Sequence, residues 1–136
     1  MSAGKRRRVA ITGIGLVTPV GNDVATTWAA LDGVKNGAAP ITLFDASGFT
    51  TRIAAEVKQF DERVITAPRK YLNFTNRSHR FALAAAEEAI REAGIAPTDA
   101  DADRWGCAVG TGMMGVEYGD LSAVQQHSAP AGDLDA

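Results

Sequence analysis

The segment Val9–Gly21 restricts the fold of this chain more than any other stretch. An apolar run with β-branched residues stops at Gly13 and Gly15, resumes, and is broken again at Pro19. This pattern is typical of a buried strand that ends in a tight turn. Since Asn22 then offers a helix N-cap, the segment predicts a strand at Val9–Thr12, a glycine turn and a helix.

The first predicted helix begins at Asn22 and ends at Gly33. Val24, Trp28 and Leu31 lie on one face at helical spacing, so Trp28 is expected to pack on the first strand. Gly33 stands where a left-handed C-cap is expected.

The second predicted helix runs from near Phe74 to Ala93, and Gly94 and Pro97 follow it as stop signals. Small and aromatic residues repeat along it every four positions: Phe81, Ala85, Ala89 and Ala93. The alanines would allow another helix or a strand to approach closely.

Two further segments are strand-like, Ile53–Val57 and Trp105–Val109. Together with Val9–Thr12 they predict an α/β fold with a mostly parallel sheet. Because two of the three are apolar throughout and need cover on both faces, the chain is expected to begin a larger domain or to need a partner. Residues 1–8 are expected to be a basic tail and 116–124 a weak helix. Residues 127–136 are expected either to be disordered or to continue into missing sequence.

Composition limits the possible functions. The chain has 136 residues and a net charge of −2, so its overall charge does not favour binding to nucleic acid. It has one cysteine, so it cannot form an internal disulfide. No apolar run is long enough to cross a membrane, and the stretch after the basic cluster Lys5–Arg8 is too broken for a signal peptide. A cytoplasmic location is expected.

The glycine turn could hold a nucleotide, but the pattern is incomplete. A dinucleotide fingerprint needs a third glycine where Thr18 stands, and Pro19 follows it. No glycine loop is followed by the Lys and Ser or Thr of a P-loop. A nucleotide-binding α/β domain therefore remains only a minor alternative.

Candidate nucleophiles and metal ligands are few. Cys107 lies inside a predicted strand, without a base or a helix N-terminus to lower its pKa. His79 and His127 have no partners at metal-ligand spacing, and the acidic loop Asp99–Asp103 lacks the glycine and distal Glu of a calcium loop. No catalytic residue and no metal site are predicted.

Glycines and two methionines follow the last predicted strand, at Gly110–Gly115. Glycines after a buried strand let the backbone pass close to a ligand, a subunit or another strand. Met113 and Met114 could line a pocket for a flexible apolar ligand or could fill a gap in a core. The residues leave both interpretations open.

Several segments, taken in order, resemble the β-ketoacyl-acyl carrier protein synthases, the elongating condensing enzymes. The similar segments are Arg8–Gly21, Trp28–Leu31 with Gly37, Phe44–Ser47, Phe81–Ala86 and Gly110–Gly115. The resemblance covers the chain to about Tyr118 and implies a thiolase-like layered α/β/α fold, here an incomplete N-terminal half over residues 9–126.

The resemblance also implies an activity. Such enzymes condense an acyl thioester with malonyl-carrier protein in fatty-acid or polyketide synthesis, usually as homodimers, without metal or redox cofactor. A cysteine carries the acyl chain, and two histidines assist decarboxylation and stabilise the oxyanion. Cys107, His79 and His127 match none of these positions, so this chain alone is expected to be inactive.

One functional residue can be carried over by resemblance. Met113 matches the family residue at the floor of the acyl pocket, beside the dimer interface, whereas Met114 stands where the pattern has glycine. The expected partners are acyl carrier protein, acyl and malonyl thioesters, and a second synthase subunit. A non-catalytic partner subunit of the chain-length-factor type is the main alternative.

Overall fold

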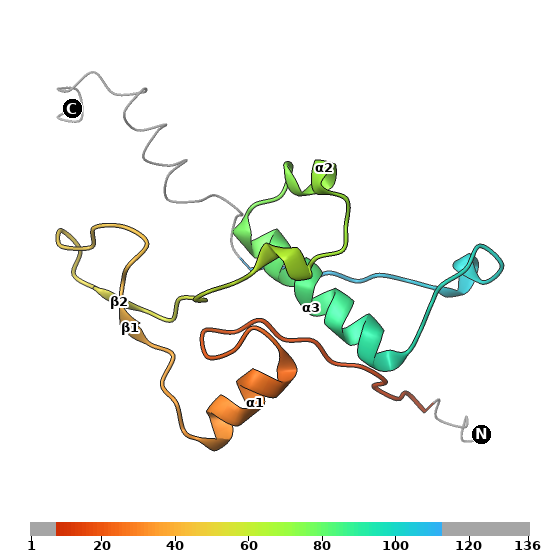
Figure 1. Cartoon of the computed structure of the whole chain (residues 1–136), viewed down its shortest axis with the longest axis horizontal. Helices are drawn as coiled ribbons and strands as arrows, with labels where there is room; N and C mark the ends of the chain where they lie inside the picture. The colour runs from red at the N-terminus through yellow and green to blue at the C-terminus, as the bar shows by residue number, and fades with distance from the viewer. Residues whose placement is uncertain (1–7, 113–136) are drawn as a thin grey trace, which may run out of the picture.

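The computed structural model describes residues 8–112 of the chain. Figure 1 shows α3 (Arg77–Ala93) at the centre, with the other elements arranged around it. The remaining elements are α1 (Val24–Asp32), β1 (Ala39–Pro40), β2 (Ile53–Ala54) and α2 (Arg69–Leu72), with short 3-10 turns at Glu62–Val64 and Ala102–Arg104.

The long helix α3 ends as predicted but begins later. Gly94 adopts the left-handed conformation, with φ 64°, and closes the helix. At the other end Asn76 is extended and forms a capping box with His79, in which the Asn76 side chain accepts from the His79 N–H at 3.0 Å. The predicted start near Phe74 is wrong because Phe74 belongs to the turn that follows α2.

The glycine turn lies directly on α3. A Cβ added at Gly13 would stand 2.0 Å from the carbonyl oxygen of Ala89, and one at Gly15 would stand 1.8 Å from that of Ala85. Only a residue without a side chain fits at this separation. The predicted close approach to the alanines of this helix is therefore confirmed.

Helix α1 begins one residue later than predicted. Asp23, not Asn22, is the N-cap, and its carboxylate accepts from the Thr26 N–H at 2.6 Å. The side chain of Asn22 is used elsewhere, since its amide donates to the carbonyl of Lys58 at 3.0 Å and to that of Gln59 at 3.2 Å. Asn22 thus joins the start of α1 to a segment far along the chain.

The predicted buried face of α1 is wrong. Trp28 is 72% exposed and does not pack on the first segment, while Thr27 and Ala30 are buried. The Thr27 hydroxyl lies 3.1 Å from that of Thr18 and donates to the carbonyl of Gly21 at 3.2 Å. These polar contacts turn the small face of α1, rather than Trp28, toward the glycine turn.

The C-terminal end of α1 also differs from the prediction. Gly33 has φ −78°, and the next residue, Val34, takes the left-handed conformation with φ 51°. The Lys35 N–H donates to the Ala30 carbonyl at 2.8 Å, which closes the helix in the manner of a Schellman motif. A β-branched residue is strained at this position.

The predicted mostly parallel sheet is wrong for residues 8–112. The one sheet that the structure describes pairs β1 with β2 in antiparallel register, Ala39 opposite Ala54. Val9–Thr12 and Trp105–Val109 have no strand assignment, and of the segment Ile53–Val57 only Ile53–Ala54 is a strand. A strand needs a neighbour at about 4.8 Å, and no described segment supplies one to the first two.

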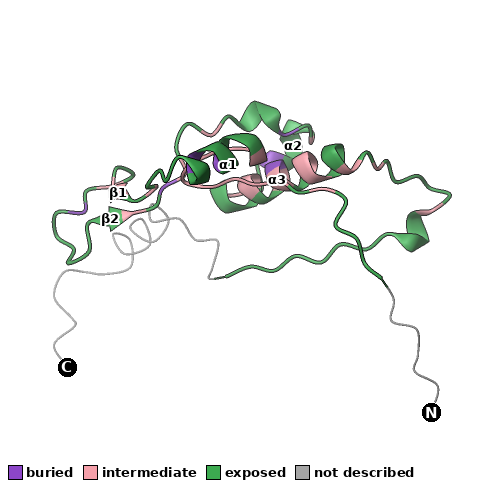
Figure 2. Ribbon diagram, turned by 90° about the horizontal axis from the view of Figure 1, so that it is seen from below, coloured by how far each residue is buried: buried purple, intermediate pink, exposed green. Residues whose placement is uncertain are grey.

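The described core is small and lies against the middle of α3. Ile65, Leu72 and Ala84 are buried together. In Figure 2 buried residues occur on α1, α2 and α3 and in the hairpin region, while the extended segments toward both ends are exposed. No described helix is long and apolar enough to cross a membrane. The predictions for residues 1–7, Met113, 116–124 and 127–136 lie outside the described residues.

Candidate functional site

The segment that leads to Met113 is extended and open. Residues 105–112 run past α3 toward its N-terminal end (Figure 1). A Cβ added at Gly110 or Gly112 would meet nothing within 4 Å in the described part of the chain. Met113 itself, the predicted substrate-binding residue, lies just beyond the described residues.

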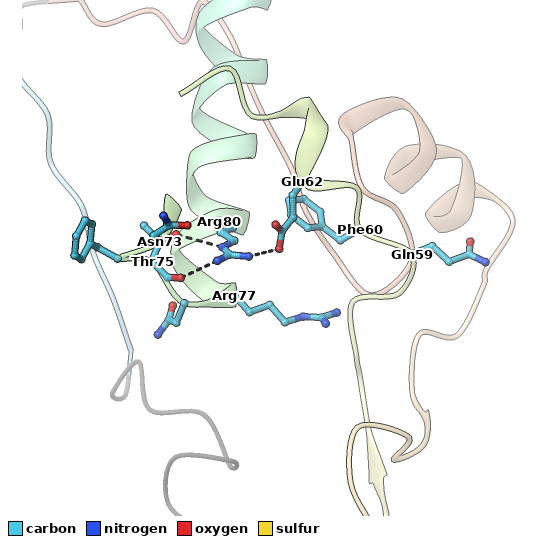
Figure 3. Close-up of a pocket in the computed structure, with 9 residues that line it drawn as sticks. Gln59, Phe60, Glu62, Asn73, Thr75, Arg77 and Arg80 are labelled. Atoms are coloured by element: carbon cyan, nitrogen blue, oxygen red, sulfur yellow. Dashed lines mark hydrogen bonds and ion pairs between the residues drawn. The ribbon is translucent and has the colours of Figure 1, made fainter. Parts of the chain in front are cut away.

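A groove of about 730 Å³ lies at the same end of α3 (Figure 3). Its walls come from the segment before α2, from the connection between α2 and α3, and from the first turn of α3. The residues that line it are Gln59, Phe60, Glu62, Asn73, Phe74, Thr75, Asn76, Arg77 and Arg80.

Arg80 forms part of one wall of this groove, and each of its guanidinium nitrogens donates a hydrogen bond within the chain. Its guanidinium donates to the Thr75 hydroxyl at 3.3 Å and to the Leu72 carbonyl at 3.1 Å, and it forms an ion pair with Glu62. The dashed lines in Figure 3 mark these contacts to Thr75 and Glu62. Because its donors are used within the chain, Arg80 fixes the wall rather than offering a charge to a ligand.

Two aromatic residues, Phe60 and Phe74, line the groove, and Phe60 contacts a third ring that is not part of the lining. The rings of Phe60 and Phe81 meet edge to face with centroids 4.9 Å apart, and the Arg77 guanidinium lies 5.2 Å from the Phe81 centroid. Gln59 at the rim has φ 53°, which is unusual for a residue with a side chain. Such strain is common where a segment is held in place for function.

Three glutamates of α3 hold the backbone of other segments. Glu92 accepts from the Ile14 N–H at 2.5 Å. Glu88 accepts from the Leu16 N–H and from the Val24 N–H, each at 2.9 Å. Glu87 accepts from the Thr66 N–H at 2.9 Å. The helix therefore fixes the glycine turn, the start of α1 and the segment that precedes α2.

Sequence reasoning missed this role of the glutamates, although a signal was present. Ile14 and Leu16 are two residues apart in an extended chain, a rise of about 6.6 Å, and their N–H groups point to the same side. Glu88 and Glu92 are one helical turn apart, about 6 Å. Two acceptors on α3 thus match two donors on the turn in spacing.

The remaining polar candidates do not form a site. The prediction that Cys107 lies inside a strand is wrong, since it has no strand assignment and its thiol is free and exposed, whereas His79 caps α3. Asp101 accepts from the Thr98 N–H at 2.8 Å and from its hydroxyl, and these bonds lower the pKa of the Asp101 carboxyl. No group of three metal-ligating side chains occurs within residues 8–112, and His127 lies outside them.

One buried carboxylate stabilises the hairpin loop. Glu56 is 8% exposed and accepts from the Thr42 hydroxyl at 2.6 Å, from the Thr42 N–H and from the Leu43 N–H. The hydrogen bonds from Thr42 lower the pKa of Glu56. A carboxylate with several donors is held in its charged form.

Comparison with known families identifies the class of protein. The family "Beta-ketoacyl synthase, N-terminal domain" matches residues 6–134, nearly the whole chain. The chain therefore belongs to the β-ketoacyl synthase family, as the ordered segments and the glycine turn on α3 had indicated.

Individual relatives show which members of the family this chain is similar to. The chain is similar to "3-oxoacyl-[acyl-carrier-protein] synthase 2" of Coxiella burnetii, with 41% identity over 114 residues, which is 84% of this chain and 27% of that protein. The enzyme of the same name from Staphylococcus aureus N315 is 38% identical over 89% of this chain and 29% of its own length. The chain thus spans less than a third of these relatives.

A solved structure is also similar. "The ishigamide ketosynthase/chain length factor" matches with a TM-score of 0.60 and 38% identity, covering 68% of this chain and 23% of that one. This likeness supports the thiolase-like layered fold for the part that is present. The structure describes few strands of it, so the layered α/β/α arrangement is only partial here.

Proposed function

We propose that this chain is the N-terminal part of a 3-oxoacyl-acyl carrier protein synthase. The proposal depends on one observation above all, the family match over residues 6–134. The intact enzyme would condense an acyl thioester with malonyl-carrier protein in fatty-acid or polyketide synthesis. It would act in the cytoplasm as a homodimer, or as a heterodimer with another synthase subunit.

The chemistry would need residues that this chain does not contribute. A cysteine thiolate attacks the acyl thioester and releases the carrier thiol. Malonyl-carrier protein then loses CO₂, and the resulting carbanion attacks the enzyme thioester, which forms the new carbon–carbon bond and expels the cysteine thiolate. Two histidines would stabilise the developing negative charges. The chain's role is to support this site.

A chimera tests the proposal. The 114 aligned residues of the Coxiella enzyme would be replaced by those of this chain. The chimera should condense acyl- and malonyl-carrier protein. The same chimera with Gly15→Val should be inactive, because the added side chain would meet the carbonyl of Ala85. A chimera that folds, binds carrier protein and yet shows no turnover would contradict the proposal.

Met113 is the residue that we propose to limit the length of the acyl chain. It follows Gly112, and residues 105–112 run toward the N-terminal end of α3 (Figure 1). Met113→Phe in the chimera should shift the preferred substrate toward shorter acyl chains, because the phenylalanine ring occupies more of the pocket than the methionine side chain. It should lower kcat/KM for the longest acyl substrates by about tenfold.

Two controls accompany this prediction. Met113→Leu conserves volume and should leave the preference unchanged. Met114→Phe places the same ring at the neighbouring position. Equal effects of the two phenylalanine variants would show that Met113 has no special place in the pocket.

A non-catalytic partner subunit is the second candidate. It is favoured by the similarity to the ishigamide ketosynthase/chain length factor. A subunit of this kind would co-purify with an active synthase and alter its product length without supplying a nucleophile.

A further inference from the structure

The loop between α1 and β1 contains an Asn-Gly pair, Asn36 and Gly37. Asn36 is exposed, and its side-chain oxygen accepts from the Ala38 N–H at 2.9 Å. This hydrogen bond forms an Asx turn, in which the carboxamide folds back over its own backbone. The carboxamide carbon is therefore held over the peptide that joins Asn36 to Gly37.

The main-chain nitrogen of Gly37 is available for a reaction. Among the described residues, its N–H donates to no backbone or side-chain acceptor. Gly33 in the same loop gives the contrast, because its N–H donates to the Ala29 carbonyl at 3.0 Å and is bound to the end of α1. Glycine also carries no side chain that would shield its nitrogen. Asn36 and Gly37 thus place a carbonyl carbon beside an unengaged nitrogen.

We propose that Asn36 is a site of spontaneous modification, at which the folded chain converts a carboxamide into a carboxylate through a succinimide. Hydroxide removes the Gly37 N–H proton, and the nitrogen attacks Cγ of Asn36. The N–Cγ bond forms, the Cγ–Nδ2 bond breaks, and Nδ2 leaves as ammonia with a proton from water. Water then opens the ring at Cγ to give aspartate, or at the main-chain carbonyl carbon to give isoaspartate.

The Ala38 N–H favours this step as well as the turn. Negative charge develops on Oδ1 of Asn36 when the nitrogen attacks, and the Ala38 N–H already donates to that oxygen. A preorganised donor stabilises the developing charge more than it stabilises the neutral carboxamide. The loop therefore holds both the electrophile and a donor for its oxyanion.

The other asparagines of the chain lack this arrangement. Asn22 donates its amide to two backbone carbonyls, and Asn76 caps α3. Asn73 precedes a phenylalanine, and none of the three is followed by glycine. A side chain on the following residue hinders approach of its nitrogen to the carboxamide. Asn36 should therefore react first.

The modification affects a contact between two parts of the fold. Gly37 lies against the segment that carries the glycine turn, since a Cβ added to it would stand 2.9 Å from Cγ1 of Val20 and 3.0 Å from Cβ of Pro19. Isoaspartate lengthens the main chain by one methylene beside this contact, whereas aspartate adds a charge and leaves the main chain unchanged. Isoaspartate should therefore loosen the loop, and aspartate should not.

Incubation of the 136-residue chain tests the proposal, followed by digestion at acidic pH and mass spectrometry. The peptide with Asn36 should gain the mass difference between an NH group and an oxygen atom, at a rate that rises with pH. The rate should exceed that at each other asparagine by at least about tenfold. A protein-isoaspartate methyltransferase with labelled S-adenosylmethionine counts the isoaspartate. Equal rates at all asparagines would refute the proposal.

A parallel incubation in urea separates the effect of the fold from that of the dipeptide. Unfolding removes the turn and the Ala38 donor, so the reaction at Asn36 should be at least as fast in the folded chain as in urea. A lower rate in the folded chain would show that the fold protects the pair and would overturn the proposal.

Two variants complete the test. Asn36→Gln should abolish the modification, because its longer side chain would have to close a larger ring. Asn36→Asp adds the charge alone, so the isoaspartate fraction of the aged chain, separated by ion exchange, should have a lower Tm than this variant. Equal Tm values would contradict the loosening of the loop. Gly37→Ala is avoided, because its Cβ would collide with Val20.

Discussion

The glycine turn at residues 13–16 and the last described segment, 105–112, are both extended and apolar, yet their surroundings differ. The turn is pressed on α3, and its N–H groups at Ile14 and Leu16 are bound by glutamates of the helix. The later segment has open space around Gly110 and Gly112 and no backbone partner among the described residues. Both segments are hydrophobic, so hydrophobicity alone does not explain why only the turn packs on α3. The turn is held because its N–H donors match the spacing of the glutamate acceptors on the helix.

The largest effect is expected where the turn approaches α3. Gly15→Val should lower the free energy of unfolding by about 3 kcal/mol or more, because the new Cβ would stand 1.8 Å from a backbone oxygen that cannot move alone. Urea denaturation measures the change. Gly110→Ala is the control on the open segment and should change it by less than about 1 kcal/mol. Equal losses at both positions would remove the contrast between the two regions.

The next effect concerns the acceptor that joins the turn to α1. Glu88→Ala leaves the N–H groups of Leu16 and Val24 without their partner and should lower the free energy of unfolding by about 2 kcal/mol. Glu88→Gln keeps one acceptor oxygen and should recover part of the loss. If both variants matched the unchanged protein in denaturation, the glutamate would not be what holds the turn.

A smaller effect of opposite sign is expected at the end of α1. Val34 has φ 51°, so Val34→Gly should relieve strain and raise the free energy of unfolding by about 1 kcal/mol. The melting temperature reports the change. Val109→Gly offers a contrast, since Val109 is also exposed but has no positive φ. A gain at both positions would mean that loss of exposed apolar surface, not backbone strain, is responsible.

The smallest effect depends on pH and concerns the hairpin loop. The pKa of Glu56 is lowered from 4.5 in the folded chain, so its stabilisation is present above that value and is lost as the pH falls below it. Glu56→Gln should therefore be less stable than the unchanged protein near neutral pH, with a difference that shrinks as the pH falls below 4.5. Thr42→Val removes the main donor and should shrink the same pH dependence. A constant difference across this range would argue against the charged form as the stabilising one.

The sequence predicted the helices better than the strands. The end of α3 at Gly94 and the close approach of glycine to alanine followed from local chemistry. The strands at Val9–Thr12 and Trp105–Val109 were not found, because a strand exists only with a neighbour and none of the described residues provides one. The prediction that Trp28 lies on the buried face of α1 was wrong. The hydrogen bond from the Thr27 hydroxyl to the Gly21 carbonyl turns the face that carries Thr27 toward the glycine turn.

The candidate site was predicted only in part. The family could be predicted because several segments resemble it in the same order along the chain, and the glycine segment was one of them. Met113 lies beyond the described residues, so its role stays a prediction. The role of the α3 glutamates could not be predicted, because a one-dimensional pattern does not show which distant N–H groups lack partners. The groove at Arg80 is formed by two stretches that are separated in sequence, 59–62 and 73–80, and could not be predicted from residue spacing.

The bonds made by Glu88 and Glu92 also bear on how the chain would fold during synthesis. They connect residues that are 64, 72 and 78 positions apart. The N-terminal turn therefore has no partner until α3 has left the ribosome, which takes several seconds at about 5–20 residues per second. Throughout that interval the apolar residues around the turn stay unprotected, so this half of the molecule would be a natural client for a chaperone that acts near the exit tunnel.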